Sequence, residues 1–182
     1  PYNWDDHQHL DPDNDALNNI EECYMDQFGS NPYAKDLFLE FDWTKSIPQN
    51  SSNEPPREEI TQMIDAFGLQ NISLHVDTGE LGGGEELPPQ SLVSYAEIID
   101  IYWDSFLHND LNNPRQNIFH YGIICDYSQS GGFAVMGWNH LNAFIISAQL
   151  LAELYPRHTK GWLATAASMH EVGHTCGLIA TT

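Results

Sequence analysis

The sequence predicts an α/β (α+β) fold in which a mixed, twisted sheet packs against helices. Segments with strand-like alternation are separated by segments whose apolar residues recur at helical spacing. One β-rich run, residues 117–127, is apolar on both faces, as expected for a central strand that is covered on both sides. Hydrophobic residues make up 41% and aromatic residues 12% of the 182 residues, which is enough to build one good core.

Two predicted strands and a helix come first. Residues 36–43 alternate as a strand does, and residues 71–77 alternate with their apolar side chains on one face. A helix over residues 57–68 lies between them, because two prolines precede it, a glycine ends it and its apolar residues fall at helical spacing. The apolar stripe of this helix consists of Ile60, Met63, Ile64 and Phe67. Residues 44–56 and 78–90 are predicted loops.

The later elements are a helix over residues 91–107, the central strand, a turn, one or two further strands and two helices. The apolar stripe of the first of these helices is expected to belong to the core. That stripe consists of Leu92, Ile99, Trp103 and Phe106. The turn covers residues 128–132, the further strands lie within 133–146 around Gly137-Trp138-Asn139, the short helix covers 147–155, and the last helix follows from Gly161.

The strongest functional signal is the H-E-x-x-H motif of residues 170–174. Side chains four residues apart lie on one face of a helix, so His170 and His174 can bind one zinc ion. Glu171 can then act as the general base that takes a proton from a water molecule at the metal. The alternative is an ordinary amphipathic helix with two surface histidines. An alanine-rich, proline-free run over residues 161–169 suits a buried helix and favours the zinc site.

Gly177, three residues after His174, marks a position where the helix can end and the chain can turn sharply. The resulting H-E-x-x-H-x-x-G pattern resembles the metzincin signature of zinc peptidases. The resemblance implies a third zinc ligand six residues after His174, where this chain has Ala180, and a methionine turn that does not follow here. The third ligand is then expected from residues beyond Thr182 or from elsewhere in the chain, or this form is poor in metal. The resemblance covers the N-terminal half of a metzincin-like catalytic domain.

The same resemblance implies where a substrate binds. In metzincins a mixed twisted sheet backs the zinc helix, and a peptide adds as a strand to an antiparallel edge strand along the cleft. That edge strand is expected between Tyr127 and Trp138, where Gly131 and Gly132 would let a peptide backbone approach. His120 could be a further site residue, but a single histidine on a strand is more often satisfied in the core.

A second metal motif occupies residues 11–22. Its oxygen-bearing side chains follow the spacing of a calcium loop, with a backbone carbonyl at the seventh position and a carboxylate at the twelfth. The expected calcium ligands are Asp11, Asp13, Asp15, Leu17 through its carbonyl, Asn19 and Glu22. Ala16 stands at the sixth position, which prefers glycine for its sharp turn. The alternative is a solvated acidic turn that caps a helix over residues 19–28.

This loop resembles those of thrombospondin type 3 and dockerin-like repeats, which are extracellular modules. Because calcium is abundant outside cells, the resemblance implies a secreted protein. The chain is then expected to consist of a calcium-binding loop with a short helix, residues 1–30, and a zincin-like catalytic domain, residues 31–182.

Residues 78–90 are rich in glycine and glutamate, and a surface loop is the simplest prediction for them. The alternative is a further cation site in this loop. Its candidate ligands are Asp77, Glu80, Glu85 and Glu86.

The net charge and the number of cysteines limit the partners and the disulfide bonds that this chain can have. Six Lys+Arg against 26 Asp+Glu give a net charge of −20, and such a chain should repel nucleic acid and anionic membranes. A run of about 18 apolar residues, which would predict a bilayer span, is absent. No signal peptide is visible, so a secreted form would be a processed one. Cys23, Cys125 and Cys176 are too few for a disulfide framework; a buried thiol is expected at Cys125, and Cys176 should not join the zinc.

Together these features predict a secreted zinc-dependent endopeptidase that uses Zn2+ and Ca2+ and acts on a peptide or protein substrate. Neither nucleic acid nor a membrane is expected as a partner. Two alternatives stay open. One is a different zincin, gluzincin-like or aminopeptidase-like, whose third ligand is a glutamate on a later helix. The other is a non-catalytic extracellular calcium-binding module with a vestigial zinc motif.

Overall fold

A computed structural model describes residues 7–47, 51–90, 92–135 and 141–178 of the chain. Gly137-Trp138-Asn139 and Ala180, which entered the predictions above, lie outside these residues. The helices are α2 (Asn19–Met25), α3 (Arg57–Gly68), α4 (Glu97–Ile101), α5 (Ala148–Leu154) and α6 (Lys160–Thr175), with short 3-10 helices η1 (Asp26–Phe28) and η3 (Pro114–Asn117) and a π-helix η2 (Tyr102–Phe106). The strands are β1 (Lys35–Ser46), β2 (Ser51–Ser52), β3 (Ile72–Asp77), β4 (Glu86–Leu87), β5 (Phe119–Cys125), β6 (Gly132–Ala134) and β7 (Ala143–Ser147).

A mixed seven-stranded sheet forms the centre of the fold, which confirms the predicted α/β class. The long strand β1 pairs in parallel with β5 along one edge and with β3 and β4 along the other. Strand β5 continues in parallel to β7, and β6 runs antiparallel to β7. Near its end, β1 also pairs antiparallel with β2. The described part of the sheet therefore places a short antiparallel strand, β6, beyond β7.

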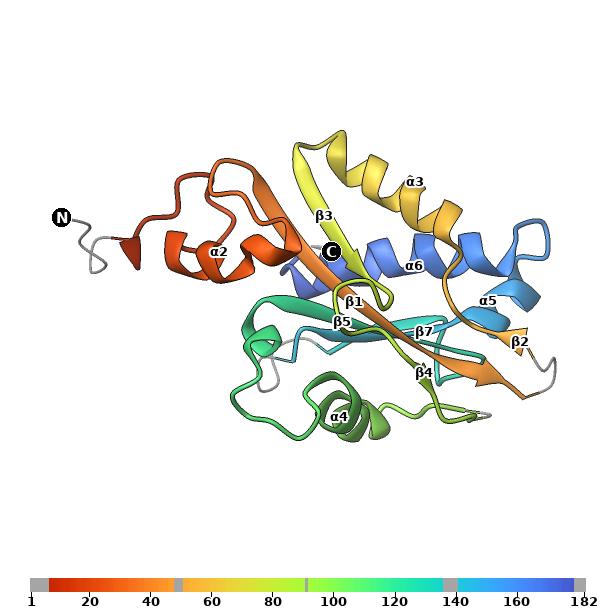
Figure 1. Ribbon diagram of the computed structural model, residues 1–182. Helices are drawn as coiled ribbons and strands as arrows, with labels where there is room; N and C mark the ends of the chain where they lie inside the picture. The colour runs from red at the N-terminus through yellow and green to blue at the C-terminus, as the bar shows by residue number, and fades with distance from the viewer. Residues whose placement is uncertain (1–6, 48–50, 91, 136–140, 179–182) are drawn as a thin grey trace.

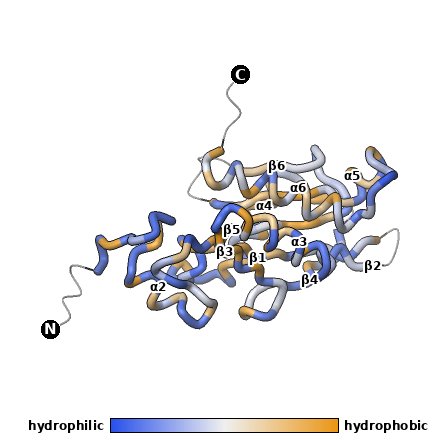
Figure 2. The backbone as a smooth tube through the Cα atoms, turned by 90° about the horizontal axis from the view of Figure 1, so that it is seen from above, coloured by the Kyte–Doolittle hydropathy of each residue, from blue (hydrophilic) through white to orange (hydrophobic). Residues whose placement is uncertain are grey.

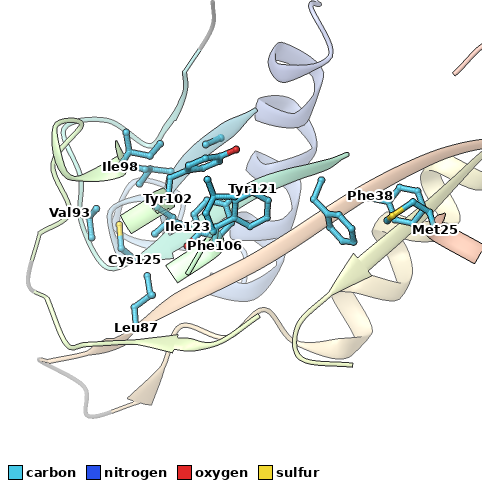
Figure 3. Close-up of a cluster of buried hydrophobic side chains, with 14 residues drawn as sticks. Met25, Phe38, Leu87, Val93, Ile98, Tyr102, Phe106, Tyr121, Ile123 and Cys125 are labelled. Carbon is cyan, nitrogen blue, oxygen red and sulfur yellow. The ribbon is translucent and has the colours of Figure 1, made fainter. Parts of the chain in front are cut away.

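Helices cover both faces of the sheet: α3 and α6 lie on one face, and α4 with η2 lies on the other (Figure 1). Alternation along β1 divides its side chains between the two layers, so that Leu39 and Phe41 pack with α3 and α6 while Phe38 packs in the other layer. In that second layer, Tyr102 and Phe106 meet the β5 side chain of Tyr121 (Figure 3). Both faces of β5 are buried, as the sequence predicted for a central strand.

The helix predicted over residues 91–107 is partly wrong. The structure begins α4 only at Glu97, and the side chains of Leu92 and Ile99, predicted for the core, are 49% and 48% exposed. The residues that the helix buries instead, Ile98, Tyr102 and Phe106, recur every four residues. A spacing longer than 3.6 residues per turn fits the π-helical stretch η2, and this widening shifts the apolar face away from the predicted stripe.

Hydropathy follows the layers of the fold. Apolar residues are concentrated in the strands at the centre, whereas the segment before β1 is largely hydrophilic and lies at one end of the molecule (Figure 2). The predicted helix over residues 57–68 is confirmed as α3, and the strand predicted over residues 36–43 is confirmed within the longer β1. Across the described ranges, every helix is too short or too polar to cross a lipid bilayer.

Candidate functional site

Helix α6 carries the H-E-x-x-H motif in its last two turns. Its start is capped by Thr159, whose hydroxyl oxygen accepts the N–H of Trp162 at 3.2 Å. Its end is closed by two backbone hydrogen bonds, from Gly177 N–H to the His174 carbonyl and from Leu178 N–H to the Gly173 carbonyl, each 2.9 Å long. This pair is a Schellman motif, and Gly177 supplies the left-handed residue that it requires, with φ of 85°.

The two histidines of the motif face one another. His170 Nε2 and His174 Nε2 lie 3.0 Å apart, a hydrogen-bonding distance that is also close to the separation of about 3.3 Å that two nitrogens bound to one tetrahedral zinc ion would have. His174 Nδ1 lies 2.8 Å from the Leu178 carbonyl oxygen, and because a carbonyl only accepts, Nδ1 carries the proton. In the neutral imidazole this leaves a lone pair on Nε2, the atom that faces His170.

The side chain of Glu171 points from helix α6 towards strand β6. Its side chain is 6% exposed, and its carboxylate accepts a hydrogen bond from the Ala134 backbone N–H. A Cβ atom at Gly132 would lie only 2.4 Å from Glu171 Oε1, so the carboxylate fills the space that glycine leaves open. Burial raises the pKa of Glu171, and the imidazoles of His170 and His174 oppose that rise. A buried carboxyl with a raised pKa suits a group that exchanges protons.

The described residues supply two of the three protein ligands that a catalytic zinc ion takes. Within them, the groups of three or more metal-ligating side chains include neither His170 nor His174. Cys176 Sγ lies 4.0 Å from His120 Nε2 and takes no part in such a group. The donor set present, two convergent imidazoles beside a buried carboxylate, nevertheless fits zinc.

His120 is buried in the core and has a hydrogen-bond partner there, as predicted for a single histidine on a strand. Its Nδ1 lies 2.7 Å from the Thr175 hydroxyl oxygen at the end of α6. Burial lowers the pKa of His120 to about 4, so its imidazole is neutral at physiological pH. Cys125 is fully buried on the same strand, as expected.

The acidic loop of residues 11–22 folds around the side chain of Asp11. Its Oδ1 accepts the Asn14 N–H at 2.7 Å, and its Oδ2 accepts the Ala16 N–H at 3.0 Å. Asp15 Oδ1 in turn accepts the Leu17 N–H at 2.8 Å. The following helix α2 is capped by Asn18 of this loop, and the acidic Glu21 completes a capping box by accepting the Asn18 N–H at 2.9 Å. The loop therefore caps the helix, as the alternative predicted, and this role leaves the other acidic side chains of the loop unexplained.

Ala16 adopts the conformation that a calcium loop needs at its sixth position. Its φ is 78°, in the left-handed region that glycine favours. The sequence prediction treated this alanine as a weakness, and the structure shows that the loop makes its sharp turn with alanine in place. A residue with a Cβ atom pays about 1–2 kcal/mol for this conformation.

Several oxygens of the predicted calcium ligands are buried without a hydrogen-bond donor. Both oxygens of Glu22, a side chain that is 2% exposed, have no partner in the described part of the chain, and neither does Asn19 Oδ1. Burial and the carboxylates of Asp13, Asp15 and Asp36 raise the pKa of Glu22 to about 7. Because ionised carboxylates are costly to bury unpaired, this donor set fits a divalent cation that prefers oxygen, such as calcium.

One acidic residue of this cluster was missed by the sequence analysis. Asp36, at the start of β1, places a carboxylate oxygen together with those of Asp15 and Glu22 within 4.8 Å of one another. Alternation along the strand places Asp36 on the same face as Glu40 and Asp42, the more polar face, so the sequence gives no signal that Asp36 is buried or that it faces the acidic loop.

Two candidate ligands of the further cation site around residues 78–90, Asp77 and Glu80, already have other partners in the structure. The Asp77 carboxylate is occupied by backbone N–H groups of Gly79, Leu81 and Gly83 and by the guanidinium of Arg115. Glu80 forms an ion pair with Arg57 at 2.6 Å. Arg115 also lies 2.7 Å from Glu40, so the place of a cation in this loop is taken by an arginine.

Compared with protein-family models, with curated proteins and with solved structures, the chain matches none of them.

Proposed function

We propose that this protein is a zinc-dependent endopeptidase that works outside the cell. The observation that carries the proposal is the convergence of His170 Nε2 and His174 Nε2, 3.0 Å apart, on the same helical turn as the buried carboxylate of Glu171. A zinc ion held there would supply Lewis-acid activation of a water molecule and of the scissile carbonyl. The resemblance of the motif to the metzincin signature supports the same class.

Each residue of the motif has a distinct task in this proposal. His170 and His174 bind the metal through Nε2, and the Leu178 carbonyl holds the His174 ring in the required tautomer. Glu171 accepts the proton of the attacking water and later donates it to the leaving amine. Its burial supports this double role, because burial brings the pKa of a carboxyl closer to neutral pH.

Strand β6 is the surface to which we assign the substrate. It runs antiparallel to β7 at the end of the described sheet, and it lies directly beside Glu171. A peptide that adds to β6 as a further strand would run past the general base. The net charge of −20 would favour the approach of basic peptides to the protein.

Calcium is the second metal of the proposal, bound by the loop of residues 11–22. The buried oxygens of Glu22 and Asn19, which have no hydrogen-bond partner within the described ranges, support it. Extracellular modules bind calcium with dissociation constants of about 0.1–1 mM, so a loop of this kind would be filled outside the cell. This is the argument for secretion.

The decisive experiment replaces Glu171 by glutamine, which keeps the shape of the side chain and removes its ability to take a proton. We expect Glu171→Gln to abolish cleavage of casein while the protein retains its zinc. Glu58→Gln, an exposed change on α3, is the matched control and should leave cleavage intact. Cleavage by Glu171→Gln at the rate of the control would refute the assignment.

One alternative is favoured by a specific observation: the described residues hold no third zinc ligand beside the histidine pair. Under this alternative the protein is a calcium-binding module whose motif binds no zinc. Elemental analysis separates the two functions. About one zinc per chain supports the peptidase, whereas calcium alone supports the module.

A further inference from the structure

We propose that Asp36, on strand β1, is a further calcium ligand, so that one calcium ion ties the N-terminal loop to the sheet behind the zinc helix. This inference rests on the calcium site proposed above and extends it beyond the twelve-residue loop. It changes the role of the ion from ordering a local loop to joining two parts of the fold.

The geometry of three carboxylates supports the assignment. Oxygens of Asp15, Glu22 and Asp36 lie within 4.8 Å of one another, although Asp36 is distant from the loop in sequence. Glu22 and Asp36 are 2% and 6% exposed, so water does not screen their charges effectively. Asp36 also touches the loop through its backbone, because its N–H donates to Asp15 Oδ2 at 2.7 Å.

A cation would stabilise the closely spaced carboxylates of this cluster. Among the described residues, the one basic side chain that contacts this cluster is His75, whose Nε2 lies 2.7 Å from Asp36 Oδ1, and a histidine carries a positive charge only when it is protonated. Among the residues that the structure describes, neither Glu22 oxygen has a hydrogen-bond donor, although Glu22 is only 2% exposed. A calcium ion takes six to eight oxygens and tolerates irregular geometry, so it can use ligands from both the loop and the strand.

The Asp36 carboxylate is already held in a fixed orientation. Oδ2 accepts the Asn31 N–H at 2.6 Å and the Ser30 hydroxyl at 3.4 Å, while Oδ1 faces His75. Each carboxylate oxygen has two lone pairs, so these hydrogen bonds leave capacity for a metal. Partners that orient a ligand from behind are what metal sites in proteins commonly show.

The position of Asp36 connects this site to helix α6. Asp15 and Asp36 line a cavity of about 300 Å³ that Val172, Gly173 and Cys176, at the end of the H-E-x-x-H helix, also line. The end of this helix therefore borders the same cavity as the residues that the calcium ion would hold together. We expect calcium to stabilise the end of α6 as well as the loop.

The test is calcium titration by calorimetry on purified protein with Asp36→Asn and Asp26→Asn. Both changes remove one negative charge, but Asp26 is an exposed residue in η1 outside the cluster. We expect Asp26→Asn to bind calcium like the wild type and Asp36→Asn to bind at least about tenfold more weakly, since even a residue behind the ligands commonly has this effect. Equal affinity of the two variants would overturn the role of Asp36 and leave the loop site intact. Absence of calcium binding by the wild type would overturn both.

A second measurement does not depend on the folding of a variant. Amide hydrogen exchange of the wild type, with and without calcium, should show added protection at Asn31 and Asp36 and at the end of α6, besides the loop itself. Protection confined to residues 11–22 would contradict the inference. The zinc motif is unchanged in both experiments, so their outcome is independent of whether the protein cleaves peptides.

Discussion

Replacing Gly132 by alanine tests whether Glu171 works from the position that the fold gives it. An added Cβ atom would lie 2.4 Å from Glu171 Oε1, 3.1 Å from its Cδ and 3.2 Å from its Cγ. Non-bonded heavy atoms are most stable at about 3.5–4.0 Å, so the carboxylate must retreat by about 1 Å. The three nearest atoms all belong to Glu171, so the clash falls first on this side chain.

We expect this retreat to reduce activity far more than stability. The atoms that meet the new methyl group are the end of a flexible side chain, so overpacking should lower the free energy of unfolding by only about 1 kcal/mol. A displacement of about 1 Å in a catalytic arrangement can reduce the rate by about 100-fold. Gly132→Ala should therefore lower kcat/KM by about 100-fold while the zinc content stays unchanged.

The assay is cleavage of a fluorogenic peptide, with zinc content and urea unfolding measured on the same preparations. Gly68→Ala is the matched control, because a Cβ atom there meets nothing within 4 Å. If Gly132→Ala keeps the kcat/KM of the control while Glu171→Gln has none, the carboxylate does not act from its place beside β6, and the reasoning is wrong.

Four further predictions concern the stability of the folded protein. Gly173→Ala should stabilise the protein to urea by about 1 kcal/mol, because its Cβ would meet only Leu178 at 3.6 Å and alanine favours a helix. Ala16→Gly should relieve the left-handed residue and add about 1 kcal/mol in calcium-saturated urea unfolding; a loss would show that the loop turns differently. Because burial lowers the pKa of His120 from 6.5 to about 4, folding favours the neutral imidazole. The stability that His120 contributes is therefore fully present above pH 6.5, and about 3 kcal/mol of the free energy of unfolding is lost as the pH falls towards 4. His120→Gln should remove this part of the pH dependence of unfolding. Raising NaCl from about 0.1 M to about 1 M should raise Tm, because the Debye screening length falls from about 10 Å to about 3 Å. Salt then weakens the repulsion among the acidic side chains that give the chain its net charge of −20, and an unchanged Tm would show that this repulsion is negligible.

Elements with local signals were predicted well from the sequence. Helix α3 begins and ends where the prolines and the glycine indicate, and β5 is covered on both faces as its apolar run requires. The apolar face of α4 and η2 could not be found in this way, because its buried residues recur every four residues through a π-helical stretch, and this departure from α-helical spacing depends on packing against β5. Strands β2 and β4 have two residues each, too few to show alternation.

The same distinction applies to the candidate site: contacts within one helix could be predicted from the sequence, and contacts between distant segments could not. Helix geometry alone brings His170, Glu171 and His174 together, since they lie within two turns. The meeting of Glu171 with Gly132 depends on how α6 packs against β6, and the meeting of Asp36 with the acidic loop depends on the register of β1. A pattern that covers twelve residues carries no information on either contact. The contact of Asp77 with Arg115 could not be predicted for the same reason, because Arg115 arrives from a distant segment.

The hydrogen bond between His174 and the Leu178 carbonyl has a consequence for the order of events during biosynthesis. The acceptor belongs to the residue whose N–H closes the helix, so the imidazole is oriented only after the turn at Gly177 has formed. A chain that is still unfolded or only partly synthesised presents two freely rotating histidines instead of a matched pair. In the proposed enzyme, cleavage would begin only when this last turn is complete, and loosening of the turn would stop it before the rest of the fold is lost.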